Sequence, residues 1–131
     1  MKELTDLLTA LKATLNEWHW LADGYSQHLQ AERIAEGIDT LIDRCKEFYL
    51  GLDGESDIAF AKESLLHATS FIENETITTP RDRALTLIDR GISICEKFDM
   101  AEYPKRAAEN LIGDISEHFV HLRYLIKFGG K

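Results

Sequence analysis

The amino-acid sequence predicts an all-α protein, a four-helix bundle with a fifth helix inserted between its two halves. Apolar residues recur at intervals of three and four along most of the chain, which is the spacing of one face of an α-helix. No stretch shows the alternation that is typical of a β-strand. The chain has 131 residues, 44% of them hydrophobic. This length suits one domain, residues 1–131, with a sizeable core.

The first two predicted helices are joined by a short turn. The first runs to about Ala22, where Asp23-Gly24 ends it, and the second runs from near Tyr25 to Gly51. The apolar face of the first consists of Leu4, Leu7, Leu8, Leu11, Leu15 and Trp18. That of the second consists of Ile34, Ile38, Leu41, Ile42, Cys45, Phe48 and Tyr49.

The third predicted helix is the inserted one. It follows a Ser56-Asp57 cap and ends near Ile72, before the polar run ENETITT. Its apolar residues are Ile58, Ala61, Leu65, Ala68 and Ile72. It is the shorter, peripheral helix of the five.

The last two predicted helices each have a proline at the start. Thr79-Pro80 begins the fourth, with Thr at the cap and Pro in the first turn, and its apolar pattern reaches Phe98. Pro104 begins the fifth, which Gly129-Gly130 ends. The apolar face of the fifth consists of Leu111, Ile115, His118, Leu122, Leu125 and Ile126. Because His118 shares this face, we expect it to be a hydrogen-bonded structural histidine.

The charge of the chain argues against nucleic acid and membranes as partners. The formal net charge is −8 at pH 7, which disfavours attraction to phosphate backbones and anionic lipids. No apolar run approaches the ~20 residues needed to span a bilayer, and MKELTD lacks the layout of a signal peptide. We therefore expect a cytoplasmic protein. Cys45 and Cys95 lie in apolar helical segments and are predicted to be buried, reduced thiols.

One strip of the second helix is strongly acidic. On a helical wheel His28 shares an arc of roughly 100° with five carboxylates: Glu32, Glu36, Asp39, Asp43 and Glu47. Neighbours one turn apart repel by about 0.2–0.5 kcal/mol each, and a bound cation would reverse that cost. The alternative is a solvated acidic face that Arg33, Arg44 and Lys46 neutralise.

Histidine favours the metal hypothesis over the solvated face. His19 ends the first helix, nine residues before His28 and across the short turn. Two imidazoles with several carboxylates form a mixed nitrogen and oxygen set that suits Fe(II), Mn(II) or Zn(II). One chain cannot complete the set, because His28 and Glu47 lie about 28 Å apart along one helix. Antiparallel pairing with a second copy would bring opposite ends of the helix together.

This pattern resembles the ferroxidase signature of the Dps mini-ferritins. The matching residues are His19-Trp20, His28, Glu32, Asp43 and Glu47, and the following FYLG is similar to the end of that family's second helix. RDRALTLIDRGISICEKFD and HLRYLIKF lie where its third and fourth helices would be. Glu32 stands where the family usually has Asp, and the interval from His19 to His28 is shorter. The resemblance implies a ferritin-like four-helix bundle.

The resemblance also implies a metal site shared by two subunits. His19, His28 and Glu32 of one subunit would face Asp43 and Glu47 of its twofold mate, with Trp20, Glu36 and Asp39 in the surroundings. Iron would be bound as Fe(II), oxidised by hydrogen peroxide or oxygen, and stored as ferric mineral. The implied assembly is a homo-oligomer, a shell of twelve subunits in the family. The Lys/Arg-rich tail with which many members hold DNA is absent, so DNA binding is not expected.

Two other functions are compatible with the residues. A non-catalytic helical oligomer or adaptor would keep the bundle without the metal, since a fold does not decide function. A relative that binds zinc or manganese would keep the ligands without oxidising iron.

Overall fold

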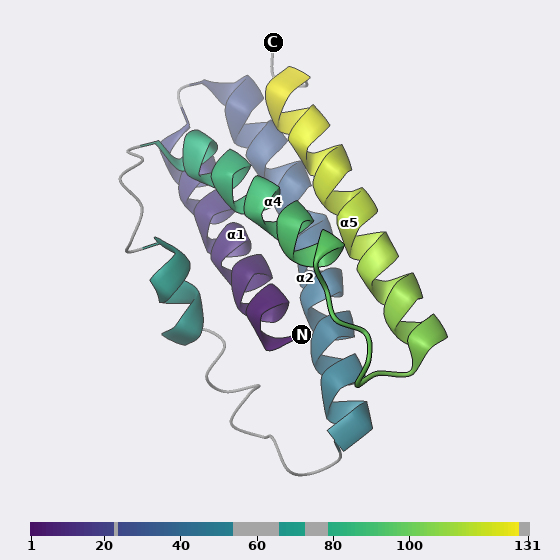
Figure 1. Cartoon of the computed structure of the whole chain (residues 1–131). Helices are drawn as coiled ribbons and strands as arrows, with labels where there is room; N and C mark the ends of the chain where they lie inside the picture. Colours follow the sequence, from purple (N-terminus) through teal and green to yellow (C-terminus); the bar gives the residue numbers. More distant parts are fainter. Residues whose placement is uncertain (23, 54–65, 73–78, 129–131) are drawn as a thin grey trace.

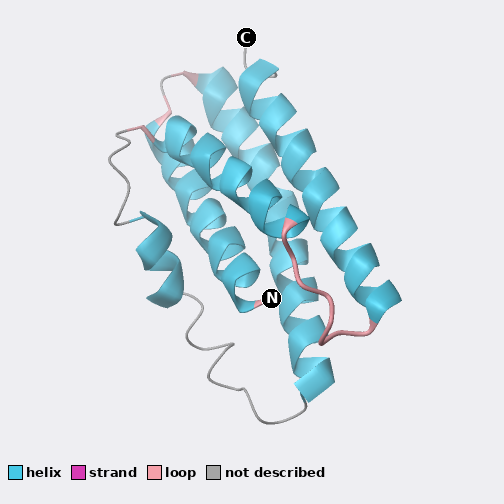
Figure 2. Ribbon diagram, in the orientation of Figure 1, coloured by secondary structure: helices cyan, strands magenta, loops and turns pink. Residues whose placement is uncertain are grey.

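The computed structural model describes residues 1–22, 24–53, 66–72 and 79–128. Its long helices are α1 (Lys2–Leu21), α2 (Tyr25–Asp53), α4 (Pro80–Glu96) and α5 (Lys105–Phe128). A further helical segment occupies residues 66–72. Throughout these ranges there is no β-strand (Figure 2). The prediction of an all-helical protein is confirmed.

The four long helices form a bundle in which each is antiparallel to both of its neighbours (Figure 1). The helix α1 packs against α2 and α4, and α5 packs against the same two helices. The helices α1 and α5 run in one direction and α2 and α4 in the other, so the end of α2 at Asp53 and the start of α4 at Pro80 lie at opposite ends of the bundle. The α2–α5 packing is the least extensive of the four.

The core lies around α1, the most deeply buried helix. Its predicted apolar face is inaccessible to solvent from Leu4 to Leu15, and Trp18 is only 4% exposed. The segment 66–72 lies along α1 (Figure 1), where Ala68 and Phe71 are buried. The apolar faces of α2, α4 and α5 close the core from the other sides. The helical wheels therefore predict the inward face of α1 correctly, whereas in α5 they omit Ile112 and Phe119, which are buried.

The helix ends follow the predicted signals in part, since α2 continues past Gly51 to Asp53. Thr79 caps α4, because its Oγ1 accepts a hydrogen bond of 3.2 Å from the Asp82 N–H. The predicted end of α4 at Phe98 is two residues too late: the helix stops at Glu96, and the Phe98 N–H donates to the Cys95 carbonyl at 3.3 Å. Predicted features between 54 and 65 and at Gly129-Gly130 lie outside the described residues.

Two further expectations concern the thiols and the membrane. Cys45 and Cys95 are free and buried, as predicted. Burial raises the pKa of each thiol to about 11, so neither supplies a thiolate at neutral pH. None of the described helices is both long and apolar enough to cross a bilayer.

Candidate metal centre

The structure brings His19 and His28 into direct contact at the α1–α2 turn. The Nδ1–H of His19 donates to the His28 carbonyl at 3.0 Å, and the Nδ1–H of His28 donates to the His19 carbonyl at 2.8 Å. The rings stack with centroids 3.7 Å apart and planes inclined by 27°. A carbonyl only accepts, so Nδ1 carries the proton in both rings and the Nε2 of each neutral ring keeps its lone pair.

The short turn is what allows this contact. The helix α1 ends at Leu21, Gly24 adopts a φ of 102°, and α2 begins at Tyr25. This φ suits glycine and makes the chain reverse within three residues. The His19 carbonyl is one of the last four in α1, which lack a partner within the helix, and the His28 ring satisfies it. Because only nine residues separate the two histidines across this turn, each ring hydrogen-bonds to the backbone carbonyl of the other. We call this arrangement an interlocked histidine pair.

Aromatic side chains surround this pair on the solvent side. Trp20 is 74% exposed, so it does not pack into the core of its own chain. Tyr25 is similarly exposed and lies nearly parallel to the His28 ring, with centroids 6.4 Å apart. Tyr25 was not among the residues predicted from the sequence. The sequence signal that could have indicated its contact with His28 is the spacing of three residues, which places both side chains on one face of a helix.

The acidic strip of α2 faces solvent, and one of its carboxylates has an ion-pair partner. Asp39 forms an ion pair with Lys12 of α1. Glu32, Glu36, Asp43 and Glu47 are exposed, and within the described part of the chain no basic side chain forms an ion pair with them.

Arg44, one of the basic residues that flank the strip, does not neutralise it. Arg44, a residue that could have done so, instead reaches α5, where its Nη2 lies 2.9 Å from Asp114 Oδ2. Four carboxylates thus remain available along about 22 Å of one helix face.

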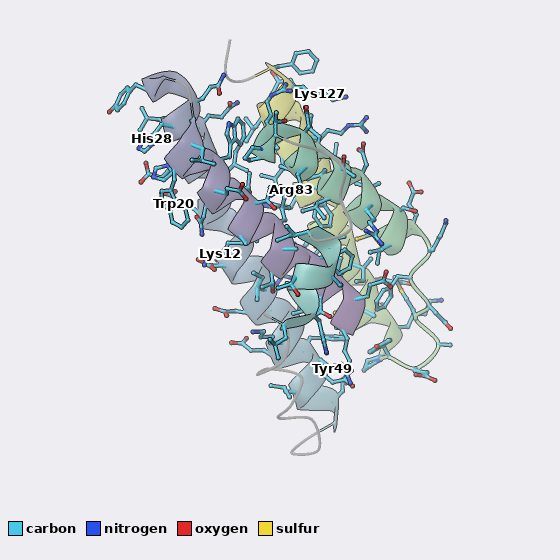
Figure 3. All side chains as sticks on the ribbon, turned by 90° about the vertical axis from the view of Figure 1, so that its left-hand side faces the viewer. Lys12, Trp20, His28, Tyr49, Arg83 and Lys127 are labelled. Carbon is cyan, nitrogen blue, oxygen red and sulfur yellow. The ribbon has the colours of Figure 1, made fainter. Side chains whose placement is uncertain are left out.

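The predicted ligands form two separate groups within one chain. His19, His28 and Glu32 lie at the α1–α2 end, while Asp43 and Glu47 lie about 22 and 28 Å from His28 along the axis of α2. Figure 3 shows the same separation, with Trp20 and His28 near one end of the molecule and Tyr49 near the other. Among the described residues, no three histidine, cysteine or acidic side chains are grouped to hold a metal ion.

The donor chemistry of the histidine end suits a divalent metal. Metal-binding imidazoles commonly hold their second nitrogen on a carbonyl, which orients the ring and selects the tautomer. Both histidines meet this condition through Nδ1. The third group at this end is Glu32, one helical turn after His28. The arrangement supplies two nitrogen donors and one carboxylate, which is an incomplete shell.

A hollow lies away from these residues. It has a volume of about 580 Å³ and opens at the other end of the bundle, between α1, the end of α4 and the loop that follows. Its lining includes Arg90, Lys97, Glu102 and Tyr103, and none of the predicted metal ligands.

Comparison with known proteins finds no family model, no curated protein and no solved structure that matches this chain. Any function for this chain must therefore be inferred from its own residues. They define an antiparallel four-helix bundle with an interlocked histidine pair at one end of α2 and unpaired carboxylates along its outer face.

Proposed function

We propose that this chain is the subunit of a Dps-like mini-ferritin. It binds Fe(II) at a histidine and carboxylate site shared by two subunits, oxidises it with hydrogen peroxide or oxygen, and keeps the ferric product within a shell of identical subunits. The observation that carries the proposal is the pair of Nδ1 hydrogen bonds at His19 and His28. They leave both Nε2 atoms as donors on the same end of the bundle.

The order and direction of the helices support a ferritin-like bundle. Two antiparallel pairs, α1 with α2 and α4 with α5, are joined by one long connection, and α2 and α4 run in the same direction. One long crossover is the connectivity of ferritin-like folds.

The spacing along α2 supports a site made by two copies. If two α2 helices pair antiparallel about a point between Gly37 and Ile38, His28 of one lies level with Glu47 of the other. The same pairing sets Glu32 level with Asp43, because both pairs are symmetric about that point. The two groups of ligands that one chain separates are then joined twice in each dimer.

The oxidation of Fe(II) by hydrogen peroxide balances in electrons and protons. Each Fe(II) gives one electron, and hydrogen peroxide takes two electrons and two protons to form two waters. Carboxylate oxygens are hard ligands, so Glu32, Asp43 and Glu47 favour the ferric product. The histidines supply the nitrogen donors that hold Fe(II) before oxidation.

Iron oxidation by purified variants tests the proposal. We expect His28→Ala and Glu47→Ala each to slow Fe(II) oxidation by about tenfold or more. Matched controls are His121→Ala and Glu117→Ala, which remove exposed side chains of the same types from α5. Oxidation at the wild-type rate in both site variants contradicts the proposal.

Complementation tests the division between subunits. A mixed dimer of His28→Ala and Glu47→Ala subunits contains one intact site and one doubly altered site. We expect co-refolded subunits to recover about a quarter of the wild-type rate, since random pairing makes half of the dimers mixed. No recovery, or a monomer in solution by sedimentation, contradicts a shared site.

A non-catalytic helical oligomer is the second candidate. Exposed apolar side chains favour it, since such residues often mark association surfaces. They occur at the α1–α2 end and along the outer face of α5, at Trp20, Leu21, Tyr25, Val120, Tyr124 and Phe128. An oligomer that binds no Fe(II) identifies this function, whereas one that binds Zn(II) or Mn(II) without oxidising iron identifies the metal-binding relative.

A further inference from the structure

The contact between α2 and α5 contains a histidine that is buried against a glycine. A Cβ atom placed on Gly37 would lie 2.8 Å from His118 Cε1 and 3.2 Å from its Nε2, so any other residue would make the ring leave this position. The ring itself is half-buried, but Nε2 is shielded from solvent. Within the described part of the chain Nε2 has no hydrogen-bond partner. His118 was predicted to be a hydrogen-bonded structural histidine on the core face; it lies half-buried, and no hydrogen bond is made at Nε2.

Charged and titratable residues flank this ring along both helices. On α5, His121 follows one turn later and Asp114 precedes it by one turn. On α2, Arg33 precedes Gly37 by one turn and Arg44 follows it by two. Asp114 is the acid nearest along the helix on the α2 side, and Arg44 already pairs with it. Glu117 is exposed. Glu36, next to Gly37 on α2, is exposed as well, and among the described residues no acidic side chain forms an ion pair with His118.

Burial, with a smaller effect from His121, lowers the pKa of His118 below the ordinary histidine value of 6.5. The folded protein thus binds fewer protons at this site than the unfolded chain does. Since the folded pKa is the lower one, the contact stabilises fully above about pH 6.5, and its contribution is lost as the pH falls through the folded pKa. We therefore expect the contact between α2 and α5 to weaken as the pH falls.

We propose that His118 is a proton-operated latch between α2 and α5. While the imidazole is neutral, its ring stays against Gly37 and the seam is closed. When Nε2 takes a proton, a buried charged N–H without an acceptor results, and the ring moves out to water. This loosens α2 from α5 but leaves α2 on α1, with which its packing is more extensive.

The latch has a consequence for iron that rests on the proposed function. Gly37 lies on α2 between Glu32 and Asp43, and thus between the two groups of predicted ligands. Loosening α2 at this point would change the register of paired α2 helices and lower iron oxidation in acid. The latch itself requires no metal, so it can be tested in protein that contains none.

Amide hydrogen exchange on the metal-free full chain tests the latch. After correction for the intrinsic pH dependence of exchange, we expect amides near Gly37 and His118 to open more at about pH 5.5 than at about pH 7.5. The expected increase is roughly five- to thirtyfold, with amides of α1 unchanged. His118→Gln, which is neutral at both values, should abolish the increase, and the matched control His121→Gln should retain it. An equal increase in His118→Gln overturns the proposal.

A titration of the wild-type protein gives the same answer if His118→Gln does not fold. The ring signals of His118, followed by NMR, should titrate below the ordinary histidine pKa and together with the Gly37 amide signal. Titration at the ordinary value, or a Gly37 signal that does not follow it, overturns the latch. Neither result bears on iron oxidation, so failure of the latch and failure of the proposed function are distinguishable.

Discussion

The helix α5 directs two successive rings to two different neighbours, and each ring meets a glycine. Phe119 lies against Gly91 of α4, where an added Cβ would be 2.5 Å from the ring's Cζ. His118 lies against Gly37 of α2, where the corresponding distance to Cε1 is 2.8 Å. Both glycines sit in the interior of a helix, where glycine is normally unfavourable. The same device, close approach of a ring to bare backbone, thus closes both sides of α5.

The chemistry of the two seams differs. Phe119 is completely buried, and its seam with α4 belongs to the continuous apolar core. His118 is half-buried, and the ion pair of Arg44 with Asp114 crosses the same seam at the surface. Apolar packing is insensitive to pH, whereas a buried imidazole is not. The packing of α4 on α5 is thus apolar, whereas that of α2, the helix that carries the predicted ligands, includes a titratable imidazole.

Removing each ring gives the largest expected contrast. Phe119→Ala should lower the free energy of unfolding by about 3–5 kcal/mol, because it leaves a cavity in the core. His118→Ala should cost about 1 kcal/mol, since the ring is only half-buried and one unpaired nitrogen goes with it. Urea unfolding at neutral pH measures both. Equal losses would mean that the two seams are equivalent.

Filling each glycine should give a smaller contrast. Gly91→Ala places a methyl group against the buried Phe119 ring, which has no room to move. The overpacking should lower the free energy of unfolding by about 1–3 kcal/mol, against a gain of ~1 kcal/mol in helix propensity. Gly37→Ala should be close to neutral, because the His118 ring can turn towards solvent. Gly113→Ala, at an open position of α5, is the control and should be stabilising. Thermal unfolding of the three variants compares them, and a larger loss in Gly37→Ala than in Gly91→Ala contradicts the comparison.

The surface ion pair should have the smallest effect. Both partners are substantially exposed, with 41% of the Arg44 side chain and 56% of the Asp114 side chain accessible. Arg44→Ala should therefore cost about 0.2–1 kcal/mol, and less at high salt. Urea unfolding at low and high ionic strength measures this. A cost above that of His118→Ala would show that charge, not packing, holds α2 to α5.

The extent of sequence prediction varies with the range of the interaction. The four long helices and the Thr79 cap were predicted because apolar periodicity and capping depend on residues a few positions apart. The end of α4 was predicted too late, because Phe98 continues the apolar spacing after the backbone has left the helix. The separation of His28 from Glu47 was also predicted, since it follows from the rise per residue of a helix.

The choice of partners was not predictable from the same patterns. Lys12 pairs with Asp39, and Arg44 pairs with Asp114 across to another helix. Helical wheels place a charge on a face but say nothing of which residue of a neighbouring helix lies opposite. The mutual hydrogen bonds of His19 and His28 likewise depend on how the turn between them is folded.

The sequence by itself determined the helices, most residues of their inward faces and the acidic strip with its flanking histidines. These are local properties, set by spacing along one chain segment. Only the tertiary structure decided that the two histidines interlock, that Asp39 is neutralised, and that Gly37 and Gly91 make room for His118 and Phe119. Those outcomes depend on the register of one helix against another, which is set by the packing of the whole core.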